Sequence, residues 1–324
     1  MISLSNMLWM YVAIFAFSCL VLVKSGSWVV KSLIRIAKYL QATEFMVAFI
    51  LMAFATTVPE FFVGITSALN RHPELSFGNI IGSNIINLTL AVAVGVLVAK
   101  GLKCEGTVIQ RSSVYTLVIA LLPVLLMLDG SISRADGVVL LLALAFYMHR
   151  LFYQSERFTK VFSNHFNRDW QRFKFFLKDL GIFIFSLALL LLAAEGIVWS
   201  STFLASALGL PLMIIGALIV ALGTNLPEIT FGIKAVTMGH KDMVLGNLMG
   251  AVVVNSTLVL GVTVLIFPLE IVSFAPYLIG IVFIIAALVF FTIFSRTGWG
   301  ITRKEALFLL LIYVAFVILE IWIQ

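Results

Sequence analysis

Two stretches of this 324-residue chain repeat one another, and they decide its fold. Residues 53–90 read AFATTVPEFFVGITSALNRHPELSFGNIIGSNIINLTL, and residues 221–258 read ALGTNLPEITFGIKAVTMGHKDMVLGNLMGAVVVNSTL. At a constant shift of 168 residues and without a gap, 13 of the 38 positions are identical, including a Pro-Glu pair and a Gly-Asn pair in each copy. Matches between apolar residues are common in any apolar sequence, but matched Pro-Glu and Gly-Asn pairs are not. The chain therefore contains an internal repeat.

The composition excludes most soluble classes of protein. Hydrophobic residues make up 62% of the chain, the mean hydropathy is +1.15, and 11% of residues are charged. Soluble domains carry about 25% charged residues. Nucleic-acid binding, a secreted disulfide scaffold and a soluble multidomain enzyme are therefore poor interpretations. The two cysteines, Cys19 and Cys104, have no metal-binding spacing and cannot form a framework of disulfides.

Apolar runs bounded by charged residues, Gly and Pro predict ten transmembrane helices, since a helix needs about 20 apolar residues to cross a bilayer. Their expected ranges are 6–36, 43–70, 76–99, 112–129, 136–153, 178–204, 211–237, 242–267, 274–294 and 303–323. The first run also contains Lys24, Lys31 and Arg35, so we interpret it as a long, tilted helix with a basic stripe at its cytoplasmic end. The expected fold class is an all-α polytopic membrane protein.

The basic residues fall almost entirely on one side of the predicted membrane. Alternate connections carry 19 Lys and Arg on one side, against only Arg71 and Arg134 on the other. The positive-inside rule places the basic side in the cytoplasm. We therefore read the net charge of +6 as an orientation signal. We expect a multi-pass protein of the plasma membrane with both termini extracytoplasmic.

The repeat divides the chain into two halves of five helices each. We expect a first repeat at 1–153, a basic cytoplasmic linker at 154–177 and a second repeat at 178–324. Because five is an odd number, the second half enters the membrane from the opposite face, so the ten helices form two inverted five-helix repeats. Many secondary transporters share this plan, with a site at mid-membrane between the repeats. The linker is interpreted as a solvated connection, with recognition of anionic lipid or of a partner as the alternative.

Two acidic residues lie deep in apolar sequence at equivalent positions of the repeats. Glu60 is in the second predicted helix and Glu228 in the seventh, where an isolated acid costs about 2.5–3.5 kcal/mol. Each follows a proline, which leaves the carbonyl four residues back, in Ala55 or Gly223, without its usual donor. Carboxylate, carbonyl and hydroxyl oxygens then lie together, which suits a hard cation. A third acid, Glu195, is expected at the membrane interface, with a second cation site as the alternative.

The third and eighth predicted helices supply further oxygen ligands. Ser83 and Asn87 are four residues apart, on one helical face, and Asn255 matches Asn87 in the second repeat. Ca²⁺ takes about six to eight oxygen ligands, which these side chains, the two glutamates and the nearby threonines could provide. We interpret the paired glycines, together with Asn79 and Asn247, as packing and helix-start residues.

The repeated motifs resemble those of the sodium/calcium exchanger family of the cation/Ca²⁺ antiporter superfamily. The resemblance rests on 55–60 (ATTVPE) and 78–84 (GNIIGSN) in the first repeat, and on 223–228 (GTNLPE) and 246–250 (GNLMG) in the second. It covers the whole chain in topology. It implies secondary active antiport of Ca²⁺ against Na⁺ by alternating access, in which the long first and sixth helices slide across a static core of the other eight.

The resemblance also implies a set of ligands. Glu60 and Glu228 would bind the central ion. The carbonyls of Ala53 and Ala221 would serve flanking Na⁺ sites. The side-chain neighbours would be Ser83, Asn87, Thr56, Thr57, Thr224, Asn225 and Asn255. No catalytic residue and no cofactor are implied beyond the transported ions. The expected partners are membrane lipid and the transported cations, and we expect the chain to function as a monomer.

Three positions depart from the family pattern. Members usually carry Ser where this chain has Asn225 and Ala251, and Asp where it has Asn255. The site then keeps two carboxylates, which neutralise one Ca²⁺ or two monovalent ions. The hypotheses are fewer Na⁺ per divalent ion, coupling to protons on Glu60 and Glu228, or preference for a different cation. A passive cation channel is a further alternative. The sequence contains neither a nucleophile paired with a base nor a zinc-binding motif, so it does not indicate an enzyme.

Overall fold

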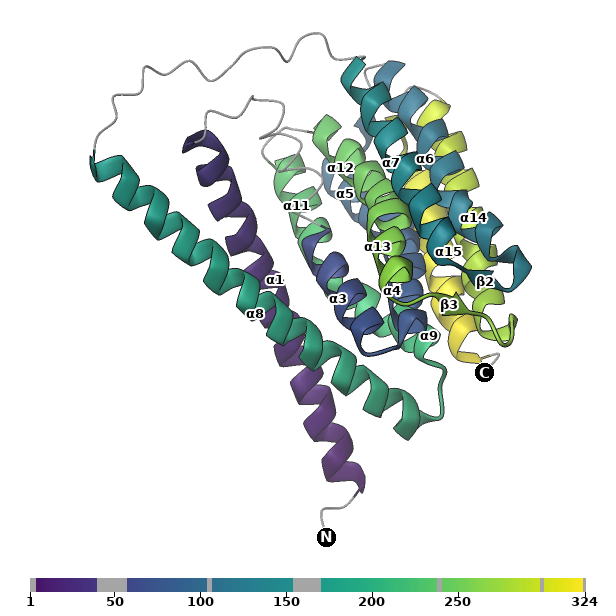
Figure 1. The fold of residues 1–324 in the computed structure, drawn as a ribbon. Coiled ribbons are helices and arrows are strands. Elements are labelled where there is room, and N and C mark those ends of the chain that lie inside the picture. The colour runs from purple at the N-terminus through teal and green to yellow at the C-terminus, as the bar shows by residue number, and fades with distance from the viewer. Residues whose placement is uncertain are drawn as a thin grey trace.

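The computed structural model describes residues 4–39, 57–103, 107–153, 170–237, 241–297 and 300–322, and almost all of them are helical (Figure 1). Up to residue 153 the helices are α1 (Leu4–Tyr39), α3 (Val58–Leu69), α4 (Pro73–Ile86), α5 (Val92–Ala99), α6 (Thr107–Leu126) and α7 (Arg134–Tyr153). The later helices are α8 (Trp170–Leu208), α9 (Leu212–Ile215), α10 (Ala221–Thr224), α11 (Leu226–Thr237), α12 (Lys241–Val254), α13 (Leu260–Ile266), α14 (Ala275–Arg296) and α15 (Arg303–Trp322). The predicted all-α class is confirmed.

Seven helical segments of the described chain are long and apolar enough to cross a membrane. The apolar segments Val58–Leu69 and Ser113–Asp129 are shorter, and residues 43–56 of the second predicted span lie outside the described residues. The chain is therefore a polytopic membrane protein, while the count of ten spans stays a prediction. α1 has 36 residues and α8 has 39. Both exceed the about 20 residues of a perpendicular span, as expected of strongly tilted helices.

The helices recur at the shift of the sequence repeat. Adding 168 to the bounds of α3 and α4 gives the bounds of α11 and α12. The π-helical segments η2 (Asn87–Ala91) and η5 (Asn255–Val259) follow α4 and α12 at the same shift, and a third, η4 (Gly216–Val220), precedes α10. The sequence pattern predicted uninterrupted helices at these places. π-helical turns are frequent at functional sites.

The strand pairing and the directions of α1 and α8 are those expected of two inverted parts of the chain, one before residue 154 and one after it. β1 (Leu102–Lys103) pairs antiparallel with β4 (Gly300–Ile301), and β2 (Ser131–Ile132) pairs antiparallel with β3 (Leu269–Glu270). Each small sheet thus takes one strand from before residue 154 and one from after it. α1 and α8, which hold equivalent places in the repeat, run in opposite directions across each other (Figure 1). Inverted repeats require this relation between equivalent helices.

The division into repeats at 1–153 and 178–324 stays a prediction. α8 begins at Trp170, so its first turns occupy part of the expected linker. The rest of that linker, residues 154–169, lies outside the described residues.

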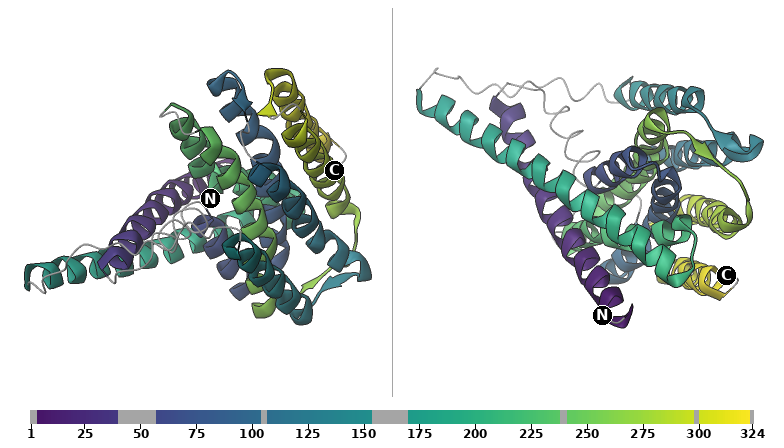
Figure 2. Two further views of the ribbon diagram at one scale, coloured as in Figure 1. Left: turned by 90° about the horizontal axis from the view of Figure 1, so that it is seen from above. Right: turned by 60° about the horizontal axis from the view of Figure 1, so that its bottom comes forward.

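α1 and α8 form a crossed pair on one side of a bundle of the other helices (Figures 1 and 2). One buried apolar cluster fills the bundle and is built mainly from α4, α5, α12, α13, α14 and α15. A second cluster joins α1 and α8 to α3 and η4. The crossed pair therefore has a packing interface with the bundle that is separate from the bundle's own core.

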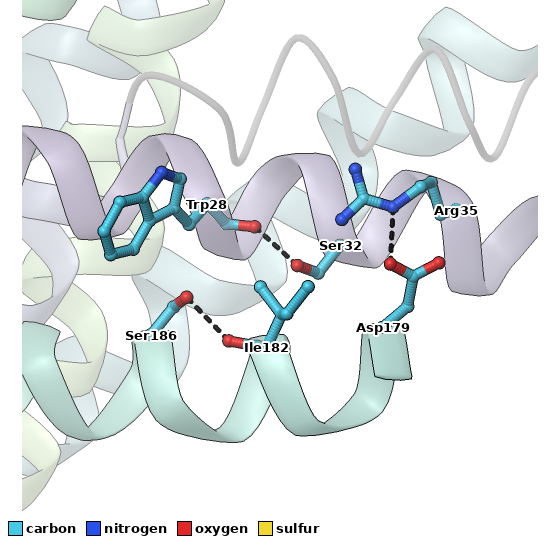
Figure 3. Close-up of polar contacts among 6 residues, drawn as sticks. All are labelled: Trp28, Ser32, Arg35, Asp179, Ile182 and Ser186. Atoms are coloured by element: carbon cyan, nitrogen blue, oxygen red, sulfur yellow. Dashed lines mark hydrogen bonds and ion pairs between the residues drawn. The ribbon is translucent and has the colours of Figure 1, made fainter. Parts of the chain in front are cut away.

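Near one end of the α1–α8 pair an ion pair joins the two helices, and near the other end an aromatic stack joins them. Arg35 Nε donates to Asp179 Oδ1 at 2.6 Å near the start of α8 (Figure 3). At the other end the rings of Tyr11 and Phe203 stack with their centroids 3.6 Å apart. The repeat shift of 168 relates Tyr11 to Asp179 and Arg35 to Phe203. Equivalent positions thus fasten both ends of the pair, once by an ion pair and once by aromatic stacking.

Candidate cation site

Glu60 and Glu228 each lie in the first turn of a helix. α3 begins at Val58 and α11 at Leu226, so each glutamate is the third residue of its helix. Their side chains are 0% and 1% exposed. A helix N-terminus presents unpaired N–H groups and the positive end of the helix dipole, both of which stabilise a buried carboxylate. At the second Pro-Glu motif the helix is interrupted, because α10 ends at Thr224 and α11 begins at Leu226.

Several buried polar atoms have no hydrogen-bond partner among the described residues. They include both carboxylate oxygens of Glu60 and both polar side-chain atoms of Asn87 and Asn255, and all three side chains are 0% exposed. Asn87 begins η2 and Asn255 begins η5. η5 packs against α3, which carries Glu60, and η2 packs against α11, which carries Glu228. Buried polar groups nearly always have partners, so this arrangement indicates a place for a ligand.

Buried hydrogen bonds join the two halves beside these groups. Asn225 Nδ2 donates to Ser83 Oγ at 2.6 Å. Thr224 Oγ1 donates to Asn79 Oδ1 at 3.2 Å. The Thr224 side chain also lies close to the Glu60 carboxylate, although neither oxygen of that carboxylate accepts a hydrogen bond of normal geometry. Asn79 and Asn247 are each the seventh residue of their helix, α4 and α12, so the predicted helix-start role is wrong. Asn79 instead accepts a hydrogen bond from a threonine of the site.

The structure places most of the sequence-predicted ligands in buried positions. Ala53 and Thr56 lie outside the described residues. Thr57 directly precedes α3, and Ala221 is the first residue of α10. The predicted residues that are at most 2% exposed are Glu60, Glu228, Ser83, Asn87, Asn255, Thr57, Thr224, Asn225 and Ala221. Their part in ion binding is a proposal.

The glycines of α4 bring two backbones into contact. A Cβ at Gly78 would overlap the carbonyl of Met213, and a Cβ at Gly82 would overlap the carbonyl of Ala217. α4 can therefore pack directly on α9 and η4 only because these positions have no side chain. The packing role predicted for the paired glycines is confirmed for Gly78 and Gly82, but it is wrong for Gly250 of the second repeat, where a Cβ would meet no described atom within 4 Å.

Two polar features near and beyond the site were missed by sequence reasoning. Asn84 Nδ2 donates to Ser256 Oγ at 2.8 Å, and Asn84 Oδ1 has no partner among the described residues. Asn84 is the last residue of the 78–84 motif. The signal available in the sequence was an amide side chain inside an apolar helix. Glu320 in α15 is 0% exposed, and its carboxylate oxygens have no partner in the described chain. Its spacing of four from buried Phe316 was the signal there.

The remaining acids of the described chain do not enlarge the site. Glu195 is exposed and accepts a hydrogen bond from Asn70 Nδ2 at 2.9 Å, which fits the expected interfacial position. The described residues contain no group of three or more His, Cys, Asp and Glu side chains that could hold a metal ion. The ligands available at the site are therefore two carboxylates with amide, hydroxyl and carbonyl oxygens. Such a set suits hard cations rather than transition metals.

Known proteins share both the sequence and the fold of this chain. A family model for the sodium/calcium exchanger protein matches residues 10–153 and 178–322. The sodium/calcium exchanger MaX1 of Methanosarcina acetivorans is 28% identical, over 93% of this chain and 96% of its own length. Among solved structures, the sodium-calcium exchanger NCX_Mj matches with a TM-score of 0.63 at 23% identity, over 96% of this chain and 99% of that chain. The H⁺/Ca²⁺ exchanger CAX matches with a TM-score of 0.74 at 17% identity, over 96% of this chain and 86% of that chain.

The two solved structures show that the fold is that of cation/Ca²⁺ exchangers. The family model goes further, because it matches nearly the whole chain on both sides of the expected linker. This chain belongs to the sodium/calcium exchanger family.

Proposed function

We propose that this protein is a secondary active antiporter that exchanges Ca²⁺ for Na⁺ by alternating access through a mid-membrane site built on Glu60 and Glu228. The observation that carries the proposal is the set of buried oxygens of Glu60, Asn87 and Asn255 that have no hydrogen-bond partner in the described part of the chain. Asn225, Ser83, Thr57 and Thr224, with the carbonyls of Ala221 and Ala53 and the hydroxyl of Thr56, complete the proposed ligand set.

The charge of the site explains why it would exchange ions rather than allow a passive, uncoupled flux. Two ionised glutamates give the site a charge of −2, which one Ca²⁺ or two monovalent cations neutralise. An uncompensated charge in a low-dielectric region is costly. The empty site therefore resists moving between its two accessible states, and each outgoing ion must be replaced.

The position of α1 suggests how access is controlled. A Cβ at Gly26 of α1 would lie 3.6 Å from Pro59 Cγ, and a Cβ at Gly223 would lie 2.8 Å from Cys19 Sγ. Pro59 and Gly223 belong to the two Pro-Glu motifs. Gly26 and Cys19 of α1 thus lie against the two Pro-Glu motifs, and displacement of the α1–α8 pair would open the site. This assigns the crossed pair as the moving part and the bundle as the static part.

The proposal includes a setting for the protein. It would reside in the plasma membrane with both termini extracytoplasmic and would function as a monomer surrounded by lipid. Its partners are the transported cations, and no cofactor and no catalytic residue are part of the proposal.

A proton-coupled or other-divalent exchanger of the same fold is the second candidate. The observation that favours it is Asn255, whose buried side chain has no hydrogen-bond partner within the described ranges, where the family pattern has an ionisable Asp. With only two carboxylates, two protons would balance one Ca²⁺.

Ca²⁺ uptake into proteoliposomes tests these proposals. Radiolabelled Ca²⁺ uptake is measured with an imposed Na⁺ gradient and, separately, with an imposed H⁺ gradient. Glu60→Gln and Glu228→Gln should each abolish uptake, because each removes one of the two site charges, whereas Glu195→Gln on exposed α8 should not. Uptake by both site variants at the wild-type rate would overturn the assignment, and Ca²⁺ flux without any counter-ion would indicate a channel.

A further inference from the structure

The Asn225 side chain is already bound to two oxygens of the proposed site. Asn225 Nδ2 donates to Ser83 Oγ at 2.6 Å and to the carbonyl of Ala221 at 2.7 Å. All three residues are 0% exposed. These two oxygens are members of the ligand set proposed above, and Ala221 was assigned to a flanking Na⁺ position.

The orientation of the Asn225 amide follows from chemistry. A backbone carbonyl can only accept hydrogen bonds, so the atom 2.7 Å from the Ala221 carbonyl oxygen must be a donor. The flipped amide would place two acceptors in contact without a hydrogen between them. The –NH₂ group therefore faces both oxygens.

The Ala221 carbonyl has no capacity left for a cation. It accepts from the Asn225 side chain and from the Asn225 backbone N–H at 3.1 Å. A carbonyl oxygen has two lone pairs. In contrast, Asn225 Oδ1 and the side-chain oxygens of Glu60 and Asn87 have no hydrogen-bond partner among the described residues. Hydrogen bonding thus divides the proposed ligands into an occupied group and an available group.

We propose that the Asn225 –NH₂ group takes the place of one flanking Na⁺, so that this protein carries one Na⁺ fewer per cycle than it would with a hydroxyl residue at position 225. The amide hydrogens supply partial positive charge to Ser83 Oγ and the Ala221 carbonyl, without adding a net charge to the site. Two carboxylates then need not balance an additional cation. This inference rests on the proposed function, because it concerns the coupling of that exchange.

The zero-flux Ca²⁺ ratio tests the inference. Proteoliposomes are held at zero membrane potential under a fixed Na⁺ gradient, and the Ca²⁺ ratio at which net flux stops is determined. Because this ratio is an equilibrium quantity, transport rates and vesicle orientation do not affect it. With a Na⁺ gradient of about tenfold, each additional coupled Na⁺ multiplies the zero-flux Ca²⁺ ratio by about tenfold.

Asn225→Ser removes the –NH₂ group and restores a hydroxyl, so it should raise the zero-flux ratio by about tenfold under that gradient. Asn225→Thr, which copies Thr57 of the first repeat, should do the same. Asn70→Ser makes the same change outside the site and should leave the ratio unchanged. An unchanged ratio in a transporting Asn225 variant would overturn the inference.

The remaining outcomes are also decisive. If wild-type protein moves no Ca²⁺ under any gradient, the proposed exchange fails, and the inference is then judged by saturation binding of radiolabelled Na⁺ to purified protein in detergent. Asn225→Ser should bind one Na⁺ more per chain than wild type, and equal binding would refute the role of the amide.

Discussion

The residues around Glu60 differ in whether their polar atoms are already hydrogen-bonded. Ser83 Oγ accepts from Asn225, and Thr224 Oγ1 donates to Asn79. Asn87 and Glu60 have no such partner among the described residues. All of these residue types looked equally suitable as cation ligands in the sequence. Their partners lie in the other half of the chain, so only a three-dimensional arrangement distinguishes a free oxygen from an occupied one.

Substitution of Gly82 tests the close approach of α4 and η4. Gly82→Ala should destabilise the protein, because its Cβ would overlap the Ala217 carbonyl, and overpacking of this kind costs about 1–3 kcal/mol. Gly181→Ala is the control, since a Cβ at Gly181 meets no described atom within 4 Å. Thermal unfolding in detergent should show a lower midpoint for Gly82→Ala only. Equal midpoints for the two variants would show that the helices do not touch at Gly82.

Helix ends and interruptions bring the proposed ligands together. α3 and α11 start at the Pro-Glu motifs, while η2 and η5 start at Asn87 and Asn255. The N-terminal ends of helices stabilise nearby negative charge by about 0.3–1 kcal/mol each at exposed sites. η2 and η5 each pack against the glutamate-bearing helix of the other half. The interruptions therefore occur where the two halves present their polar groups to each other.

A reversible cross-link tests the division into a moving pair and a static bundle. A Cβ at Gly223 would lie 3.6 Å from the Cβ of Cys19, within the about 3.5–4.5 Å that a disulfide requires. In Gly223→Cys, oxidation should join α1 to α10 and stop exchange, and reduction should restore it. The double variant Cys19→Ala/Gly223→Cys lacks this partner and should be insensitive to oxidation.

A second cross-link within the pair completes this test. Tyr11→Cys with Phe203→Cys would join α1 to α8 where the two rings now stack. Exchange should continue after this cross-link forms, because both helices belong to the moving part. Loss of exchange there, or full exchange with α1 fixed to α10, would contradict the proposed division.

The whole molecule combines a repeated plan with an uneven distribution of charge. Helix bounds recur at a shift of 168, and each small sheet pairs a strand from before residue 154 with one from after it. The basic residues do not follow the repeat, since 19 lie on one side of the predicted membrane and two on the other. Insertion direction is set by charge, whereas the site depends on the repeated motifs, so the two features are physically independent.

Cysteine labelling tests the predicted orientation. In a background with Cys19→Ala and Cys104→Ala, single cysteines are introduced as Ser3→Cys, Gln324→Cys and Ser163→Cys. A membrane-impermeant maleimide applied to intact cells should label the first two, because both termini are expected outside, and should not label Ser163→Cys until the membrane is permeabilised. Labelling of Ser163→Cys in intact cells would reverse the orientation.

Sequence patterns alone were enough to predict the all-α membrane fold, the exchanger family and the burial of Glu60 and Glu228. These features follow from local rules: apolar length, the cost of an acid in hydrocarbon, and motifs repeated at one shift. Three features required the packed structure: the π-helical turns, the burial of Glu320 and the hydrogen bond from Asn225 that occupies Ser83 Oγ. Each depends on contacts between residues far apart in the chain, which no local pattern contains.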